Sequence, residues 1–134
     1  MENIISVIKK LEGLRHSKGV SEIEIKSAEE RLDLVFSADY KMYLENFGAI
    51  SAKGIELTGL NVSSRINVVD VTLNERELNP NIPSNMYVIE NIAIEGILIL
   101  QNEKSEVFEA RETGKMNKIH NNLSDYLSSY NSVI

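Results

Sequence analysis

The side chains most often used in catalysis are sparse in this sequence. Cysteine is absent, which excludes a thiolate nucleophile, a cysteine-ligated zinc ion and disulfide bonds. The two histidines, His16 and His120, stand in polar segments without further ligands at the spacing that a metal site requires. The seven glycines form neither a GxGxxG nor a GxxxxGK phosphate loop, and no serine lies in a GxSxG motif. The sequence therefore predicts no catalytic, cofactor-binding or metal-binding residue.

Carboxylates are the abundant functional group, and they are concentrated in one part of the chain. Residues 70–112 contain nine acidic and three basic residues, so this stretch accounts for the whole net charge of −6. Six glutamates of the stretch are interpreted as a patch that receives Lys and Arg side chains of a partner: Glu75, Glu77, Glu103, Glu106, Glu109 and Glu112. The alternative is a solvated charged face. Glu75 and Glu77 are also the residue types of glycoside hydrolysis, although neighbouring helical carboxylates point away from each other.

Length and charge limit the class of protein. The chain has 134 residues, 43% hydrophobic and 25% charged, which is typical of one globular domain. A net charge of −6 opposes nucleic-acid binding, because such proteins neutralise phosphates with Lys and Arg. The sequence has no apolar run long enough to span a bilayer and no secretory signal, so we expect a cytoplasmic protein without a membrane partner.

Apolar residues at helical spacing predict helices at both ends of the chain. Ser21 and Glu24 fit a capping box at the start of one helix, and Gly48 is placed to end another. The predicted helices are residues 3–15, a segment that begins at Ser21, residues 37–47 and a segment that follows Asn122. One aromatic stripe is expected in the core: Tyr40, Tyr43 and Phe47.

Short apolar runs predict strands in the middle of the chain. The runs are residues 55–60, 86–90, 97–100 and 107–110. Residues 68–73 fit either a strand or the start of a helix, whereas residues 72–78 favour a helix. The last three runs suit an antiparallel meander. The pattern predicts an α+β fold of one domain, in which N-terminal helices and a C-terminal helix pack on one mainly antiparallel sheet.

Several of these stretches resemble the SUKH superfamily, which includes the yeast Smi/Knr cell-wall regulator and many bacterial immunity proteins. The resemblance covers nearly the whole chain and is strongest over residues 25–50. Its motifs are Glu30-Arg31-Leu32, Ser37-Ala38-Asp39-Tyr40-Lys41-Met42-Tyr43-Leu44 and Phe47-Gly48-Ala49. Two positions depart from the family pattern. Phe36-Ser37 replaces a Leu-Pro before the aromatic helix, and Ser105 replaces a Gly in a hairpin turn.

The resemblance implies a non-enzymatic protein that needs no cofactor. Many bacterial members of the family neutralise a polymorphic toxin, often a nuclease, by binding its toxic domain in the cytoplasm. We therefore expect an immunity protein whose partner is a cognate, basic toxin domain. A regulatory scaffold that docks on a cellular enzyme is the alternative, and a small hydrolase using Glu75 and Glu77 is a third class. Edge strands of such a sheet can pair with those of a second copy, but the sequence does not predict a dimer.

Overall fold

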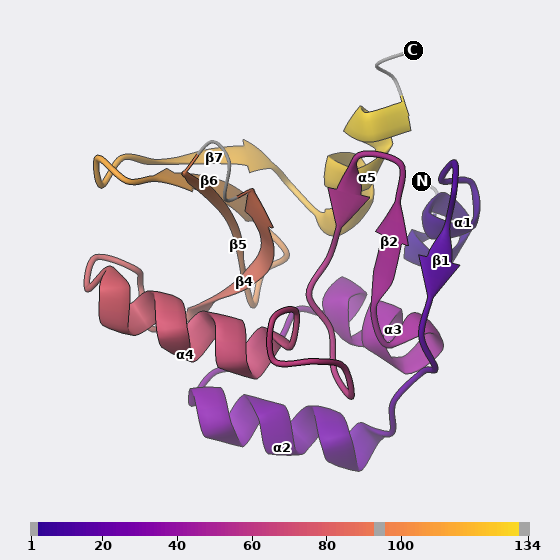
Figure 1. Cartoon of the computed structure of the whole chain (residues 1–134), viewed down its shortest axis with the longest axis horizontal. Helices are drawn as coiled ribbons and strands as arrows, with labels where there is room; N and C mark the ends of the chain where they lie inside the picture. The colour runs from indigo at the N-terminus through magenta and orange to yellow at the C-terminus, as the bar shows by residue number, and fades with distance from the viewer. Residues whose placement is uncertain (1–2, 93–95, 132–134) are drawn as a thin grey trace.

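The computed structural model describes residues 3–92 and 96–131, which form five helices and seven strands (Figure 1). The elements in chain order are α1 Ile4–Lys9, β1 Arg15–His16, α2 Glu22–Leu32, α3 Ala38–Phe47, β2 Ile50–Ala52, β3 Ile55–Glu56, α4 Val68–Leu78, β4 Met86–Ile92, β5 Ile97–Asn102, β6 Val107–Arg111, β7 Met116–His120 and α5 Leu123–Asn131. The predicted α+β class is confirmed.

The strands form two antiparallel sheets, whereas the sequence analysis predicted one. The smaller sheet has the order β1-β2-β3, and the larger is the meander β4-β5-β6-β7. The sequence analysis missed β1 and β2 because they are only two and three residues long and are defined by pairing across the chain, with Arg15 opposite Ser51. It missed β7 because most of that strand is exposed and lacks apolar alternation.

The first helix is shorter than predicted. The sequence analysis expected residues 3–15, but α1 ends at Lys9, with Lys10 as its C-cap. Gly13 then has a φ of 71°, in the left-handed region, which turns the chain away from the helix axis. Residues 15–16 pair with β2 instead, so a short sheet replaces the last predicted turn.

Local capping signals define the ends of α2 and α3 as predicted. The N–H of Glu24 donates to Ser21 Oγ at 3.2 Å, and the N–H of Ser21 donates to Glu24 Oε2 at 3.0 Å. Gly48 ends α3 with a φ of 72°, and a Cβ added there would lie 2.2 Å from the carbonyl oxygen of Lys18. Glycine is therefore required at this position both by backbone conformation and by space.

Ser37 preserves the start of α3 at one of the two positions that depart from the SUKH pattern. Its side chain accepts a hydrogen bond from the N–H of Tyr40 at 3.2 Å. Its own N–H donates to Tyr87 Oη at 3.0 Å, a hydrogen bond that proline could not make. The substitution thus keeps the helix and adds a link from α3 to β4.

Two apolar clusters occupy opposite faces of the larger sheet. The main cluster contains residues from α1, α2, α3 and α5, together with Tyr87, Ile89, Ile97 and Ile99 of the sheet. It includes the three aromatic residues that were predicted in the core: Tyr40, Tyr43 and Phe47. The second cluster lies under α4 and comprises Val71, Ile82, Met86, Val88, Leu98, Leu100 and Ala110. Because both faces of β5 are covered, all six of its residues are buried.

Thr58, which follows β3, connects the smaller sheet to β4. Its N–H donates to the carbonyl of Ile89 at 2.9 Å, and its hydroxyl lies 2.8 Å from the carbonyl of Val88. Tyr43 Oη donates to the carbonyl of Thr58 at 2.6 Å, and Tyr40 Oη lies 2.8 Å from Thr58 Oγ1. The segment around Thr58 therefore pairs with the free edge of β4, where a further strand would otherwise lie.

The Asp39 carboxylate joins α3 to the larger sheet and to α5. Its Oδ1 accepts from Ser37 Oγ, from Gln101 Nε2 at 3.2 Å and from Ser105 Oγ at 3.2 Å. Its Oδ2 accepts from the backbone N–H of Leu123 at 2.8 Å, at the start of α5. One side chain thus holds together three elements that are far apart in the sequence.

The contact with Asp39 also explains the second departure from the family pattern. Ser105 has a φ of 71°, a conformation that glycine adopts at little cost and serine adopts rarely. The hydrogen bond from its hydroxyl to Asp39 compensates for that cost. The β5–β6 turn therefore keeps the conformation that a glycine would favour.

We expect Asp39→Ala to lower the free energy of unfolding by about 3 kcal/mol, because several hydrogen bonds to an ionised group are lost together. Asp125→Ala is the matched control, since Asp125 is an exposed aspartate in the first turn of α5. It should cost less than about 1 kcal/mol. Urea denaturation of both variants measures the difference, and equal losses would contradict the role given to Asp39.

Candidate functional site

Neither metal coordination nor membrane insertion is indicated by the described residues. Across residues 3–92 and 96–131, no three His, Asp or Glu side chains come together as metal ligands would. None of the helices described is long and apolar enough to cross a membrane. The two histidines pack against aromatic rings, His16 with its ring centre 5.4 Å from that of Phe47 and His120 at 5.8 Å from Tyr126.

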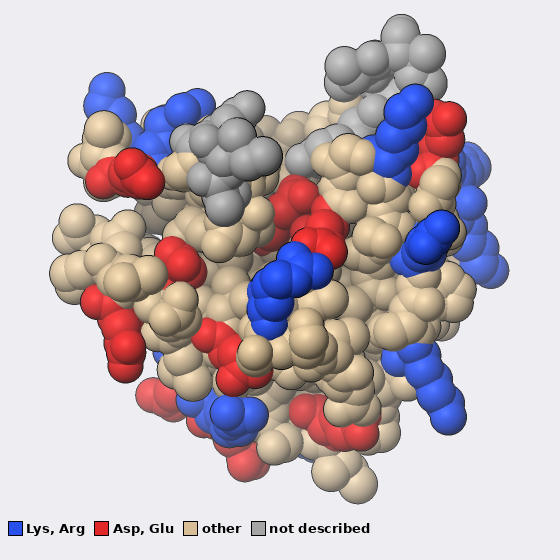
Figure 2. Space-filling model, viewed as in Figure 1, with Lys and Arg blue, Asp and Glu red and all other residues tan. Residues whose placement is uncertain are grey.

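The two sides of the molecule differ in surface charge. In the view of Figure 2, separate acidic side chains lie over the half formed by α4 and the larger sheet. Lys and Arg side chains gather along the opposite edge, over the helical half, and others lie over the β6–β7 hairpin. The six predicted partner-binding glutamates all belong to the acidic half, on α4, β6 or the two turns that flank β6.

Two of the six glutamates are already neutralised by neighbours on their own sheet. Glu106 contacts Lys118 Nζ at 2.9 Å and accepts from Asn102 Nδ2 at 3.0 Å. Both hydrogen bonds lower the pKa of Glu106, and the one from Asn102 has the larger effect. Glu109 contacts Arg111 at 2.5 Å. These two carboxylates therefore have less charge to offer a partner than their number suggests.

The remaining four glutamates do not form one patch. Glu103 lies in the β5–β6 turn and Glu112 in the β6–β7 turn, at opposite ends of β6 and roughly 20 Å apart by strand geometry. Glu75 and Glu77 are two residues apart on α4, which places them about 200° apart around the helix axis. Glu75 is half-buried and Glu77 is exposed. The Glu75–Glu77 pair therefore cannot converge on one substrate, as the hydrolase alternative would require.

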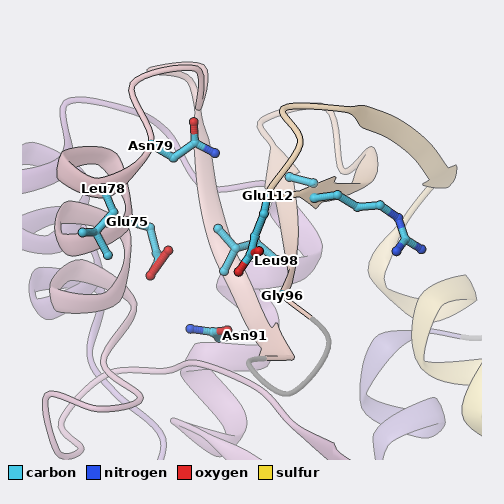
Figure 3. Close-up of a pocket in the computed structure, with 9 residues that line it drawn as sticks. Glu75, Leu78, Asn79, Asn91, Gly96, Leu98 and Glu112 are labelled. Carbon is cyan, nitrogen blue, oxygen red and sulfur yellow. The ribbon is translucent and has the colours of Figure 1, made fainter.

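Glu75 and Glu112 do converge, on a hollow of about 450 Å³ between α4 and the larger sheet. Figure 3 shows Glu75 pointing from α4 toward the strands and Glu112 descending from the β6–β7 turn into the same space. The lining residues are Glu75, Leu78, Asn79, Asn91, Gly96, Leu98, Ala110, Arg111 and Glu112. The hollow thus has two carboxylates, two amides and an apolar base.

Gly96 makes room for Glu112. A Cβ added at Gly96 would lie 2.9 Å from both Cδ and Oε1 of Glu112, closer than atoms of two side chains can approach. Any larger residue at position 96 would therefore force the Glu112 carboxylate to shift. The sequence analysis did not identify Gly96, because nothing in the local sequence connects it with a residue on the next hairpin.

The carboxylates of Glu75 and Glu112 have no hydrogen-bond or ion-pair partner among the residues that the structure describes. Arg111 also borders the hollow, but its side chain points elsewhere. In the β5–β6 register Arg111 lies opposite Ile97 and Ala110 opposite Leu98, so Arg111 belongs to the sheet face that Ala110 does not share. Burial between α4 and the sheet raises the pKa of Glu75.

Among the residues described, Glu75 and Glu112 lack the hydrogen bonds that hold a catalytic acid–base pair in place. Two carboxylates, one with a raised pKa, are also found where an acid and a base act together. Catalytic groups, however, must be held within a fraction of an ångström by hydrogen bonds of their own. Glu112 is exposed on a hairpin turn and has no such bond within the described part of the chain. An exposed carboxylate on the rim can turn toward an entering cation.

We expect Glu75→Gln to raise the free energy of unfolding at pH 7, by up to about 0.5 kcal/mol. A folded-state pKa above the unfolded value means that ionisation of Glu75 costs the folded state. That cost is present above the folded-state pKa and disappears as the pH falls below 4.5, the ordinary value. Glu77→Gln, on the opposite side of α4, is the control. A loss of stability at pH 7 in the Glu75 variant would contradict this assignment.

Comparison with known families identifies the relatives of this chain. The family SUKH_5, described as SMI1-KNR4 cell-wall, matches residues 1–132. A comparison with curated proteins found no match. The family match extends over both sheets, all five described helices and the hollow between α4 and β5. The chain therefore belongs to the SMI1-KNR4 family of the SUKH superfamily, which its sequence motifs resemble.

Proposed function

We propose that this protein is a non-enzymatic immunity protein of a bacterium, which binds a cognate polymorphic toxin domain in the cytoplasm and blocks its active site or substrate groove. Membership of the SMI1-KNR4 family supports this proposal. The observation that carries it is the pair of unpaired carboxylates, Glu75 and Glu112, at the hollow beside α4. Binding by such a protein requires a complementary surface and no catalytic residue.

The charge of the acidic half supports the proposal of a basic partner. A nuclease domain holds phosphates with Lys and Arg, so its substrate groove is basic. This chain has a net charge of −6, all of it arising from residues 70–112. Its negative charge can therefore attract such a groove as the phosphates of the substrate do. Complementary charge of this kind speeds encounter and sets the register of the complex.

The interface must extend beyond the hollow itself. A specific complex buries roughly 800 Å² on each partner, which is about a tenth of the 7527 Å² of accessible surface on this chain. Leu78 and Met116 flank the hollow region on α4 and β7 and are 71% and 37% exposed. These apolar side chains can supply the water-excluding part of an interface.

Co-expression with the toxin domain encoded beside this gene tests the proposal. We expect the protein to restore growth and to co-purify with the toxin domain. Glu75→Lys together with Glu112→Lys should weaken binding at least about tenfold and reduce its dependence on salt. The control is Glu12→Lys with Glu45→Lys, which makes the same change in net charge at exposed positions of the helical half.

Absence of both rescue and co-purification with any neighbouring toxin would contradict the immunity function. Recovery of a housekeeping enzyme from cells that lack a toxin locus would instead favour the regulatory scaffold. Equal weakening by the two double variants would show that net charge matters and that the face beside α4 does not.

A further inference from the structure

We propose that the hollow between α4 and the larger sheet receives one arginine side chain of the protein partner. The inference deepens the proposed function and rests on it for the identity of the partner. It depends on three features of the hollow, which are its volume, the apolar character of its base and the placement of two unpaired carboxylates on opposite walls.

The base of the hollow suits the aliphatic part of a long side chain. Leu98 and Ala110 come from neighbouring strands, lie opposite each other in register and are buried. Leu78 extends this apolar surface on the α4 side. Arginine and lysine place their methylene groups against apolar surface of this kind and keep the charged end near water.

The upper part of the hollow suits a planar cation. Glu75 approaches from α4 and Glu112 from the β6–β7 turn, so their carboxylates meet an entering group from two sides (Figure 3). A guanidinium presents five donors in one plane and can bind two carboxylates at once, whereas an ammonium is a point charge. The side-chain oxygen of Asn91 offers a further acceptor on the lining, whereas that of Asn79 already accepts from the N–H of Asn81 at 3.1 Å.

No cation of this chain fills that role among the residues described. Arg111 lies on the other sheet face and pairs with Glu109. Lys118 pairs with Glu106, near the start of β6 and away from Glu112. The free protein therefore leaves two carboxylates near an apolar base without a cation of this chain, and a partner's cation would offset the desolvation of the half-buried Glu75.

The test uses a single amino-acid probe, so that it does not depend on identifying the toxin. N-acetyl-L-arginine amide is titrated into the ¹⁵N-labelled protein, and amide shifts are followed by NMR. We expect shifts at the backbone amides that line the hollow, among them Glu75, Gly96, Leu98 and Glu112. N-acetyl-L-citrulline amide has nearly the same shape without the charge and should produce much smaller shifts.

Matched variants locate the contribution of the two carboxylates. Glu75→Gln with Glu112→Gln should weaken binding of the arginine probe about fivefold to tenfold. Glu77→Gln with Glu103→Gln removes the same charge outside the hollow and should leave the affinity unchanged. Well-dispersed spectra of both double variants confirm that each is folded.

Several results would overturn the proposal. They are unchanged affinity in the Glu75 and Glu112 double variant, equal shifts with citrulline, shifts that map away from the hollow, and no binding. Movement of the hollow amides with protein concentration alone would assign the hollow to a second copy of this chain and would also overturn it. Probe binding without toxin neutralisation would refute the immunity function alone, whereas neutralisation without probe binding would refute the pocket alone.

Discussion

The arrangement of the helical half against the larger sheet depends on the hydrogen bonds that the Asp39 carboxylate accepts. This carboxylate accepts hydrogen bonds from Gln101 on β5, from Ser105 in the following turn and from the first amide of α5. Tyr87 extends this network, because its hydroxyl donates to Gln101 Oε1 at 2.7 Å and accepts from the N–H of Ser37. Burial raises the pKa of Tyr87 well above its ordinary value, so the hydroxyl stays protonated and able to donate. A buried network of this kind specifies one arrangement because each member needs its partners.

That fixed arrangement explains why a hollow exists on the outer face of the larger sheet. The inner face is held against α3 and α5, so the outer face is left to α4 alone. Arg76 links α4 to its surroundings by donating to the carbonyls of Leu32 and Ser84. The C-terminal end of α4 and the β6–β7 hairpin then stand apart over Leu98 and Ala110, with one carboxylate on each. The hollow on this face is thus a consequence of how the core is covered.

The sequence predicted what depends on neighbours along the chain and missed what depends on distant pairing. Caps at Ser21, Ser37 and Gly48 are local, and the helices they bound were predicted correctly. Strands β1, β2 and β7 are short or exposed, and only their partners define them. The same distinction holds for the site. The sequence showed which segment is rich in acidic residues. The convergence of Glu75 with Glu112 depends on how α4 and the β6–β7 hairpin pack, and the separation of Glu75 from Glu77 depends on the helical conformation of α4.

Hydrogen–deuterium exchange of the protein with and without its cognate toxin domain tests the central claim most directly, since it locates the binding face without any mutation. Binding through the acidic half predicts slower exchange in peptides that cover the end of α4 and residues 110–116, with little change in α1 and α3. Protection confined to the helical half, with α4 and the β6–β7 hairpin unaffected, would contradict the account.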